Sequence, residues 1–380
     1  MKHVDFLFKG FCFSGSKVGL RLFLLLLLAF SGLESRAQVK DFVTGADLGW
    51  LTESESRGHK VYNSAGEAME GTALMKSFGM EAVRIRVWVD PIKHGNWCSK
   101  EDALNKALRA KALGMDVMID FHYSDWWADP KKQNIPAAWS GHSYEEMKED
   151  VRAHTIEVLE FLKAFGVEPR WVQVGNETTH GFLWSVKSDP ATGWPAPDGE
   201  GNIIITEDMA RAETNPEHYA GLFQAGYEAV KQVCPEATVI VHLDDGFDRN
   251  LYDWNLGILR DHGAKFDMVG MSLYPYWALE ENKRDSAEAT ITECMENIKH
   301  VAKEFGCDVM LVEVGMDALN PEEGYKQLSR IIREAKENTE GYCRGIFYWE
   351  PECKPSQYRL GAFSEDGHPT KIMQAFEENR

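Results

Sequence analysis

A glutamate follows a short apolar run near the middle of the chain, where it could act as a proton donor. The run Trp171–Val174 is aromatic and β-branched, which is typical of a buried strand, and Gly175 ends it. Asn176 and Glu177 follow directly, at the point where ligands and catalytic groups collect in a parallel α/β sheet or barrel. A helix N-cap explains the same two residues equally well, because both side chains can satisfy free backbone amides.

A second glutamate, Glu313, stands near the end of the apolar run 308–314. Two carboxyl groups can hydrolyse a glycosidic bond: one protonates the leaving oxygen, and the other attacks the anomeric carbon or activates water. A separation of about 5–5.5 Å predicts retention of the anomeric configuration. We therefore predict that Glu177 and Glu313 converge, although their strands are not neighbours. Arg86 and Asn176 would hydrogen-bond the nucleophile or the sugar 2-hydroxyl.

Further polar and aromatic residues fall at the carboxyl ends of other predicted strands. Taken singly, an aspartate there is often a helix cap, a tryptophan is usually core, and a histidine is more often structural than catalytic. Their collection at one end is typical of a carbohydrate groove, because sugar C–H faces lie on aromatic rings and sugar hydroxyls need polar partners. Arg84 shares a strand face with Arg86 by the two-residue period. The candidate substrate-binding residues are Asp47, Arg86, Asp120, His122, Asn176, His242, Tyr274, Trp277 and Trp349.

The strands that would carry these residues alternate with helices along the chain. The predicted strands are 42–48, 82–89, 116–121, 171–174, 238–243, 266–272, 308–314 and 345–349. The predicted helices are 65–78, 100–113, 143–165, 216–233, 250–261, 286–305, 321–337 and 370–378. Strands that are each followed by a helix, repeated in this number, predict an α/β fold of the (β/α)₈ TIM-barrel class.

Residues 38–380 are predicted to form a single domain. Their length exceeds the roughly 250 residues typical of such a barrel, and two long strand-to-helix loops, 122–140 and 178–215, take up the excess. Neither a Pro/Ser-rich linker nor an internal repeat divides the chain. A doubly wound open sheet is the alternative fold, although no GxGxxG motif follows the first strand.

The first 37 residues have the pattern of an export signal. Basic residues precede the apolar run 22–30, which is too short to span a bilayer. The sequence Ser35-Arg-Ala37 ends in a small residue and favours cleavage after Ala37. We therefore predict export to the periplasm, the cell surface or the extracellular space, with no integral membrane segment after cleavage.

Charge and cysteine content narrow the range of partners. The formal net charge of −19 argues against nucleic acid or an anionic membrane surface and fits a neutral substrate. Six of the seven cysteines lie after residue 37, but their scattered positions favour mostly free, buried thiols. A bridge between Cys343 and Cys353 is not expected, since the strand between them is roughly 20 Å long. No Cys or His spacing indicates zinc, and we expect a monomer without a cofactor.

Five motifs extend across nearly the whole mature chain. They are Gly45-Ala-Asp-Leu48, Arg84-Ile-Arg-Val-Trp-Val-Asp-Pro91, Asp120-Phe-His-Tyr-Ser-Asp-Trp-Trp-Ala-Asp-Pro130, Gln173-Val-Gly-Asn-Glu177 and Tyr348-Trp-Glu-Pro351. Together they resemble glycoside hydrolase family 53, the arabinogalactan endo-β-1,4-galactanases, and the run from Asp120 to Pro130 is highly diagnostic. The resemblance implies a retaining enzyme that acts on β-1,4-galactan, with Glu177 as acid/base and Glu313 as nucleophile. It also implies that the sugar at the cleavage point is surrounded by Arg86, His122, Asn176, His242, Tyr274 and Trp349.

The chain departs from the family pattern on two of its later strands. Ser272-Leu-Tyr-Pro275 has one tyrosine where the family usually shows two before the proline, and Val312-Glu-Val-Gly-Met316 lacks the threonine that relatives often carry before the glutamate. The loop 315–321 is shorter than the one that holds calcium in some bacterial relatives, so we expect no calcium there. Asp244, Asp245 and Asp248 could bind an ion, but a solvated loop or a helix cap is the simpler interpretation.

Two other functions stay open from the sequence. A barrel that binds galactan without cleaving it would need the aromatic groove but neither glutamate. A related retaining enzyme could act on another β-glycan, such as mannan or glucan. The length of the products and the choice between endo and exo action are also open.

Overall fold

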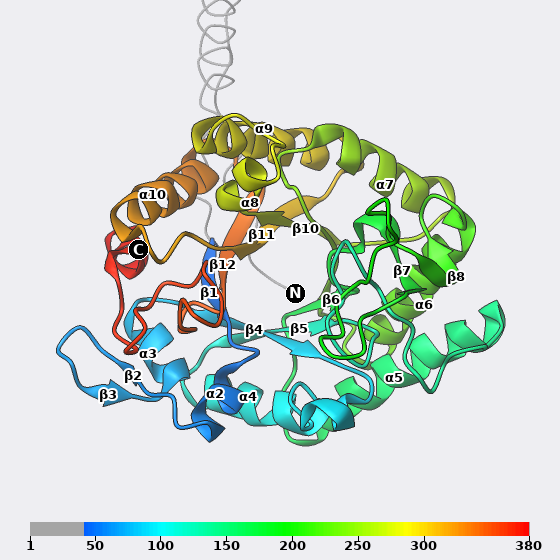
Figure 1. The fold of residues 1–380 in the computed structure, drawn as a ribbon, viewed down its shortest axis with the longest axis horizontal. Coiled ribbons are helices and arrows are strands. Elements are labelled where there is room, and N and C mark those ends of the chain that lie inside the picture. Colours follow the sequence, from blue (N-terminus) through cyan, green and yellow to red (C-terminus); the bar gives the residue numbers. More distant parts are fainter. Residues whose placement is uncertain (1–41, 380) are drawn as a thin grey trace, which may run out of the picture. The chain divides into compact units, whose positions relative to one another are not determined.

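The computed structural model describes residues 42–379, and the predicted export signal lies outside the described residues. Eight parallel strands close into a barrel, with helices arranged around it (Figure 1). The barrel strands are β1 (Val43–Asp47), β4 (Ala82–Val87), β5 (Asp116–Phe121), β6 (Trp171–Val174), β9 (Thr238–Leu243), β10 (Met268–Leu273), β11 (Asp308–Val314) and β12 (Cys343–Trp349). Strand β1 pairs with both β4 and β12, so the ring has no edge and is not an open sheet. The predicted (β/α)₈ barrel is confirmed.

Helices follow the strands and pack on the outside of the barrel (Figure 1). The main ones are α3 (Gly71–Ser77), α4 (Lys100–Ala112), α5 (Tyr144–Ala164), α6 (Pro216–Val233), α7 (Arg249–Asp261), α9 (Ala287–Phe305), α10 (Pro321–Glu337) and α11 (Gln374–Glu378). A serine begins each of α4, α5 and α9, because the side chains of Ser99, Ser143 and Ser286 accept a hydrogen bond from a first-turn amide. At α5, Glu146 also bonds back to the amide of Ser143, which completes a capping box.

The interior of the barrel changes from apolar to polar along the strands. Its floor is a buried cluster that consists of Val43, Ala82, Met118, Trp171, Ile240, Met268, Met310, Val312 and Phe347. Closer to the carboxyl ends, the buried side chains are charged or amide groups, among them Asp47, Arg84 and Gln173. A second and larger apolar core lies between the strands and the helices. The buried polar side chains inside the barrel therefore lie towards the carboxyl ends of the strands, above the apolar floor.

The predicted helix 65–78 begins later than expected. Only α3 is helical, and the residues before it form a hairpin. The strands of this hairpin are β2 (Val61–Tyr62) and β3 (Ala68–Met69). Asn63 closes the turn, because its side chain accepts hydrogen bonds from the amides of Ala65 and Glu67. Glu70 then caps α3 through the amide of Ala73, at 2.8 Å.

The long loop 178–215 also contains structure that the sequence pattern did not predict. Strands β7 (Gly181–Val186) and β8 (Ile205–Arg211) form an antiparallel hairpin within it. Two short helices were missed as well, α2 (Leu51–Ser56) and α8 (Pro275–Glu280). The predicted final helix, 370–378, divides into a 3₁₀ turn, η3 (Lys371–Met373), and α11.

The cysteines agree with the interpretation made from their spacing. Within residues 42–379, none of the six cysteines forms a disulfide, and all are buried except Cys307, which is partly exposed. Cys343 and Cys353 are both free. In the same range, no helix combines the length and the apolar character needed to cross a membrane.

Candidate active site

Glu177 and Glu313 lie close together at the mouth of the barrel. Three atoms lie within 4.8 Å of one another: one carboxyl oxygen of each glutamate and one ring nitrogen of His242. Glu313 belongs to β11 and is 5% exposed, whereas Glu177 follows β6 and is partly exposed. Two carboxyl groups from distant strands thus lie close together, and Glu177 is the more accessible of the two.

Glu177 is held in an unusual backbone conformation. Its φ is 44° and its ψ is 56°, in the left-handed region that non-glycine residues rarely occupy. It stands at the cap position of a short 3₁₀ helix, η2 (Thr178–His180), but its side chain makes no capping hydrogen bond. Its Oε1 accepts a hydrogen bond from Ser272 Oγ at 2.7 Å instead. The alternative of a simple helix cap is therefore excluded for this glutamate.

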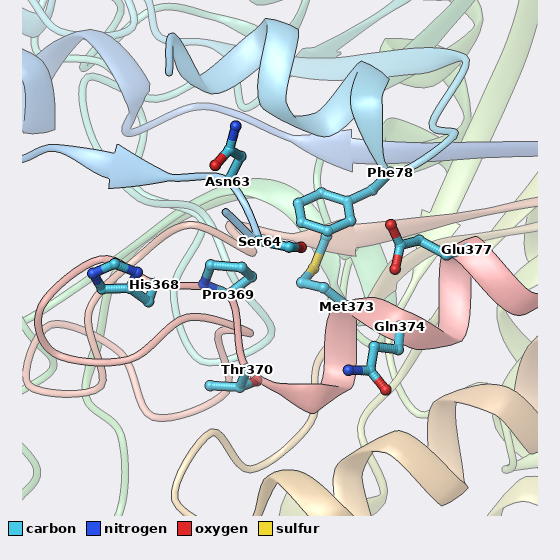
Figure 2. Close-up of a pocket in the computed structure, with 9 residues that line it drawn as sticks. All are labelled: Asn63, Ser64, Phe78, His368, Pro369, Thr370, Met373, Gln374 and Glu377. Atoms are coloured by element: carbon cyan, nitrogen blue, oxygen red, sulfur yellow. The ribbon is translucent and has the colours of Figure 1, made fainter. Parts of the chain in front are cut away.

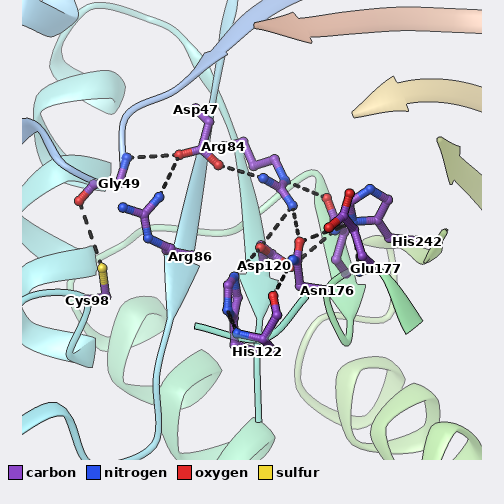
Figure 3. Close-up of polar contacts among 12 residues, drawn as sticks. Asp47, Gly49, Arg84, Arg86, Cys98, Asp120, His122, Asn176, Glu177 and His242 are labelled. Carbon is purple, nitrogen blue, oxygen red and sulfur yellow. Dashed lines mark hydrogen bonds and ion pairs between the residues drawn. The ribbon is translucent and has the colours of Figure 1, made fainter. Parts of the chain in front are cut away.

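A directed hydrogen-bond chain reaches Glu177 from His242. The backbone N–H of Glu177 points at His242 Nδ1 at 3.3 Å, so that nitrogen must accept. His242 is consequently neutral and donates from Nε2 to Ser272 Oγ at 2.8 Å, which leaves the serine proton for Glu177. Burial and the nearby Arg84 guanidinium agree with this, because both hold the pKa of His242 well below its usual range. Figure 3 shows His242 beside Glu177 and Asn176.

Glu313 has a different set of partners. Arg84 Nη2 lies 2.9 Å from its Oε1, and the hydroxyl of Tyr274 donates to its Oε2 at 2.9 Å. Burial raises the pKa of Glu313 to about 7, although Arg84 and Tyr274 act to lower it. Glu177 has no cation of this kind, and burial together with Glu313 raises its pKa well above the usual range. The pair is therefore suited to hold a proton on Glu177 and a negative charge on Glu313.

Arg84 joins the polar residues at the strand ends into one network (Figure 3). Its Nε donates to Gln173 Oε1 at 2.7 Å, which fixes the orientation of that amide, and its Nη1 donates to Asp47 at 2.6 Å. Its Nη2 lies 2.9 Å from Asp120 and 2.8 Å from Asn176 Oδ1. Every nitrogen of this buried guanidinium has a partner, so its position against Glu313 is set by several strands at once.

Arg86, two residues further along β4, does not contact Glu313. Its Nη1 bonds Asp47 at 3.2 Å and Glu350 at 2.5 Å, and its guanidinium carbon lies 4.2 Å from the centre of the Trp127 ring. The contact with the predicted nucleophile that the sequence suggested for Arg86 is thus made by Arg84. Arg86 instead supports the aromatic wall beside the cleft.

His122 and Asn176 hold the loop that follows β5. His122 Nδ1 accepts from the amide of Ala128 at 3.1 Å, and its Nε2 faces Asp120 at 3.1 Å. Asn176 Nδ2 donates to the carbonyl of the same alanine at 2.8 Å. Burial lowers the pKa of His122, so it is neutral at ordinary pH. Both side chains thereby anchor the loop that carries Trp126 and Trp127.

Aromatic rings line one side of the cleft. The ring centre of Trp349 lies 4.9 Å from that of Trp50 and 4.6 Å from that of Tyr358, in edge-to-face contacts. Trp277 is 39% exposed, and its indole N–H donates to the Tyr358 hydroxyl at 3.2 Å. Trp127 completes the set, 6.0 Å from Trp349. These rings together form one aromatic wall.

Comparison with known proteins agrees with this geometry. The family model for glycosyl hydrolase family 53 matches residues 43–379. The chain belongs to glycosyl hydrolase family 53. An endo-β-1,4-galactanase of Bacillus subtilis is 29% identical over 83% of this chain and 71% of its own. A probable arabinogalactan endo-β-1,4-galactanase A of Aspergillus terreus is 29% identical over 86% of this chain and 90% of its own. A solved structure of a fungal β-1,4-galactanase superposes with a TM-score of 0.74 at 24% identity, covering 89% of this chain and 99% of the other.

Glu177, His242 and Glu313 are close enough together that a metal ion has to be considered in this family 53 barrel. Both ring nitrogens of His242 are already engaged, Nδ1 by the Glu177 amide and Nε2 by Ser272. The imidazole therefore has no free lone pair directed at the two carboxylates, and the residues do not fit a metal site.

The three aspartates after β9 have separate partners. Asp248 caps α7 by accepting from two backbone amides, and Asp245 pairs with Lys283. Asp244 accepts from the Thr179 hydroxyl. The interpretation of this cluster as caps and loop contacts agrees with these bonds.

A surface pocket elsewhere lacks the features of the acid pair. It lies between the β2–β3 turn, the end of α3 and the C-terminal segment, as Figure 2 shows. Its lining includes one carboxyl group, Glu377, and one imidazole, His368, but none of the predicted site residues. This pocket therefore shares no residue with the acid pair.

Sequence reasoning missed several side chains of the site. Gln173 and Ser272 are buried polar residues inside barrel strands, and they contact His242 and Glu177. The two-residue period was a usable signal, since Ser272 shares a strand face with Tyr274. Tyr358 lies in the last loop, where no pattern distinguished it.

Proposed function

We propose that this family 53 glycoside hydrolase cleaves β-1,4-galactosidic bonds of galactan, including the type I arabinogalactan side chains of pectin, with retention of configuration. The close approach of Glu177 and Glu313 carries the proposal, since one oxygen of each lies within 4.8 Å of the other. This is compatible with the roughly 5–5.5 Å between the carboxyl groups of retaining enzymes and is shorter than the roughly 6.5–9.5 Å of inverting ones. The substrate follows from the relatives, which are described as β-1,4-galactanases.

In the proposed mechanism Glu313 attacks the anomeric carbon and forms a glycosyl ester, while Glu177 gives its proton to the leaving oxygen. Glu177 then takes a proton from water, which attacks the same carbon and releases Glu313. Arg84 and Tyr274 support the first step, because they favour the ionised form of Glu313.

The bond from Ser272 decides which oxygen of Glu177 carries the proton. Oε1 accepts from the serine hydroxyl, so the acidic proton of Glu177 resides on Oε2. Since His242 fixes the direction of that serine bond, the acid is presented to the substrate with one oxygen only. A fixed orientation of the acid lowers the entropic part of the activation barrier.

Substrate binding is proposed to use the aromatic wall of Trp277, Tyr358 and Trp349, with sugar hydroxyl groups bound by Asn176. Asp47, Arg86, Asp120 and His122 would act mainly by holding these groups in place, because each is buried and bonded within the network. We also propose that the enzyme is an exported monomer that needs no cofactor for turnover.

Incubation with pectic galactan tests the proposal. The wild-type protein should release galacto-oligosaccharides, and Glu313→Ala should release none under the same conditions. Proton NMR of the first product should show the β-anomer before mutarotation. Binding of galactan without any release would favour the non-catalytic alternative, and release from mannan or glucan alone would reassign the substrate.

A further inference from the structure

A second aromatic surface lies away from the reacting pair, at the end of the β7–β8 insertion. Trp194 is 48% exposed, and its ring lies 5.5 Å from that of Trp126. His94 stacks on Trp126 at 4.9 Å with the ring planes only 7° apart. A half-exposed indole that lies beside two further rings offers an aromatic surface on which a sugar ring could stack.

A buried lysine holds this tryptophan from one side. Lys132 is 0% exposed, and its ammonium lies 4.2 Å from the Trp194 ring centre and 4.7 Å from that of Trp126. The same ammonium donates to the carbonyl of Trp127 at 2.9 Å. With a cation against one face, the exposed part of Trp194 is its opposite face and edges.

The segment around Trp194 is internally bonded. Asp189 accepts from the amide of Ala191, and its own amide donates to the carbonyl of Trp194 at 2.8 Å. Ser188 and Pro195 form a bridge across the loop, and Ala196 donates to Lys187. The exposed ring is therefore presented in one orientation, so little conformational entropy is lost when a ligand covers it.

The surface is connected to the acid pair through adjacent residues. Gln133, next to Lys132, donates from Nε2 to the carbonyls of Asn176 at 2.8 Å and Glu177 at 3.2 Å. These contacts keep Trp194 within roughly 20 Å of Glu177. Such a distance corresponds to a few sugar units along an extended chain.

Ring contacts also continue from the wall of the cleft to this surface. Trp349 lies 6.0 Å from Trp127, which lies 5.4 Å from Trp88. Trp88 lies 6.0 Å from His94, the ring stacked on Trp126. Because Trp88 is buried, these contacts join the two groups of rings inside the protein and fix their relative positions.

We propose that Trp194 and Trp126 form a distal subsite, in which a galactosyl unit of the chain bound at the Glu177–Glu313 pair stacks on the free face of Trp194. This inference rests on the proposed function. A galactan chain is the expected occupant because galactose offers one apolar face of about the size of an indole, and because Lys132 and Gln133 connect Trp194 to Glu177. Lys132 strengthens the stacking surface by fixing its plane.

The test compares Trp194→Ala with Trp254→Ala, a matched control at a tryptophan that is 38% exposed on α7. Rates are measured on galactan and on a short aryl β-galactobioside, which cannot reach both sites. We expect Trp194→Ala to lower kcat/KM on galactan by roughly 3- to 10-fold and to leave the short substrate unchanged. Trp194→Tyr should recover part of the loss, and Trp254→Ala should match the wild type on both substrates.

Calorimetry with galacto-oligosaccharides of increasing length, on the Glu313→Ala protein, gives a readout that does not need turnover. The gain in affinity beyond the shortest oligosaccharides should disappear when Trp194→Ala is added. Equal affinities with and without Trp194 at every length, or an equal loss on the short substrate, would overturn the distal subsite. Failure of the wild type to cleave galactan would overturn the proposed function, whereas the length dependence of binding would still decide on the subsite.

Discussion

Two arginines on one strand perform different tasks at the mouth of this barrel. Arg84 and Arg86 are both 1% exposed and both contact Asp47. Each Arg84 nitrogen has a polar partner, and one of these partners is Glu313. In Arg86, Nε and Nη2 have no hydrogen-bond partner, and the guanidinium lies against indole rings instead.

The difference shows how two identical groups, one period apart on a strand, acquire separate roles. Arg84 lies in the layer of the barrel where carboxylates and amides converge, so its charge acts on the reacting pair. Arg86 lies one layer nearer the rim, where Glu350 and the tryptophans of the wall are its neighbours. The first sets electrostatics, and the second sets the position of the aromatic rings.

Replacement of Arg84 should have the largest effect. Arg84→Lys keeps the charge but cannot reach Gln173, Asp47 and Glu313 together. We expect kcat/KM to fall by roughly 10²- to 10³-fold, the size associated with the loss of one preorganised donor. Glu313 must be ionised to attack, so activity is lost as the pH falls through its pKa of about 7. The variant should move this acidic limb to higher pH, and an unshifted limb would contradict the assignment.

Removal of the Ser272 hydroxyl should have the next largest effect. Ser272→Ala deletes the bond that lowers the pKa of Glu177. Glu177 must be protonated to act as acid, so activity is lost as the pH rises through its pKa, and that limb should move to still higher pH. We expect a rate loss of roughly tenfold on galactan. A merely structural role for Ser272 would lower the rate without moving the alkaline limb, and Ser272→Thr should restore it.

Arg86→Lys provides the comparison with Arg84→Lys. The ammonium can still reach Asp47 or Glu350, but the planar contact with Trp127 is lost. We expect kcat/KM to change by less than about tenfold, mainly through KM, with both limbs of the pH profile in place. Thermal unfolding should begin at lower temperature. A rate loss equal to that of Arg84→Lys would show that Arg84 and Arg86 do not have separate electrostatic and positioning roles.

Lys132 extends the comparison to a third buried cation, and its replacement should have the smallest effect on rate. Burial lowers the pKa of Lys132 from 10.5 to about 8. Between pH 8 and pH 10.5 the Lys132 amine is mostly protonated in the unfolded chain but mostly neutral in the folded one. The free energy of unfolding of the wild type should therefore rise with pH relative to that of Lys132→Met, by up to about 3 kcal/mol. Denaturant unfolding of both proteins at pH 7.5 and pH 10, as a paired difference, measures this. A constant difference would mean that Lys132 titrates normally.

The barrel and the acid pair could be predicted because local patterns determine them. β-Branched runs such as Val239–Val241 mark buried strands, and residues directly after such runs must meet at one end of a closed ring. Glu177 and Glu313 were selected because both stand at or near the ends of such runs and because glycoside hydrolysis needs two carboxyl groups. The hairpin β7–β8 was not predicted, because its connecting segment is rich in Pro, Gly and Asp and because neither strand belongs to the barrel.

The choice between Arg84 and Arg86 could not be made from the sequence. The two-residue period places both on the inner face, and which layer meets Glu313 depends on the tilt and stagger of eight strands. The register shift between Met271 and Ser272 could not be predicted either, because it arises only from the pairing of β10 with β11. The contact between Ser272 and Glu177 was therefore not predicted.

The left-handed backbone at Glu177 has a consequence for evolution and engineering. Glycine adopts this conformation freely, whereas a glutamate there is strained by an amount on the order of 1 kcal/mol. An inactive protein with glycine at this position should therefore tolerate more heat than the active one. Selection for robustness alone would favour glycine at this position, so a strained glutamate here fits the proposed role of Glu177 as the acid.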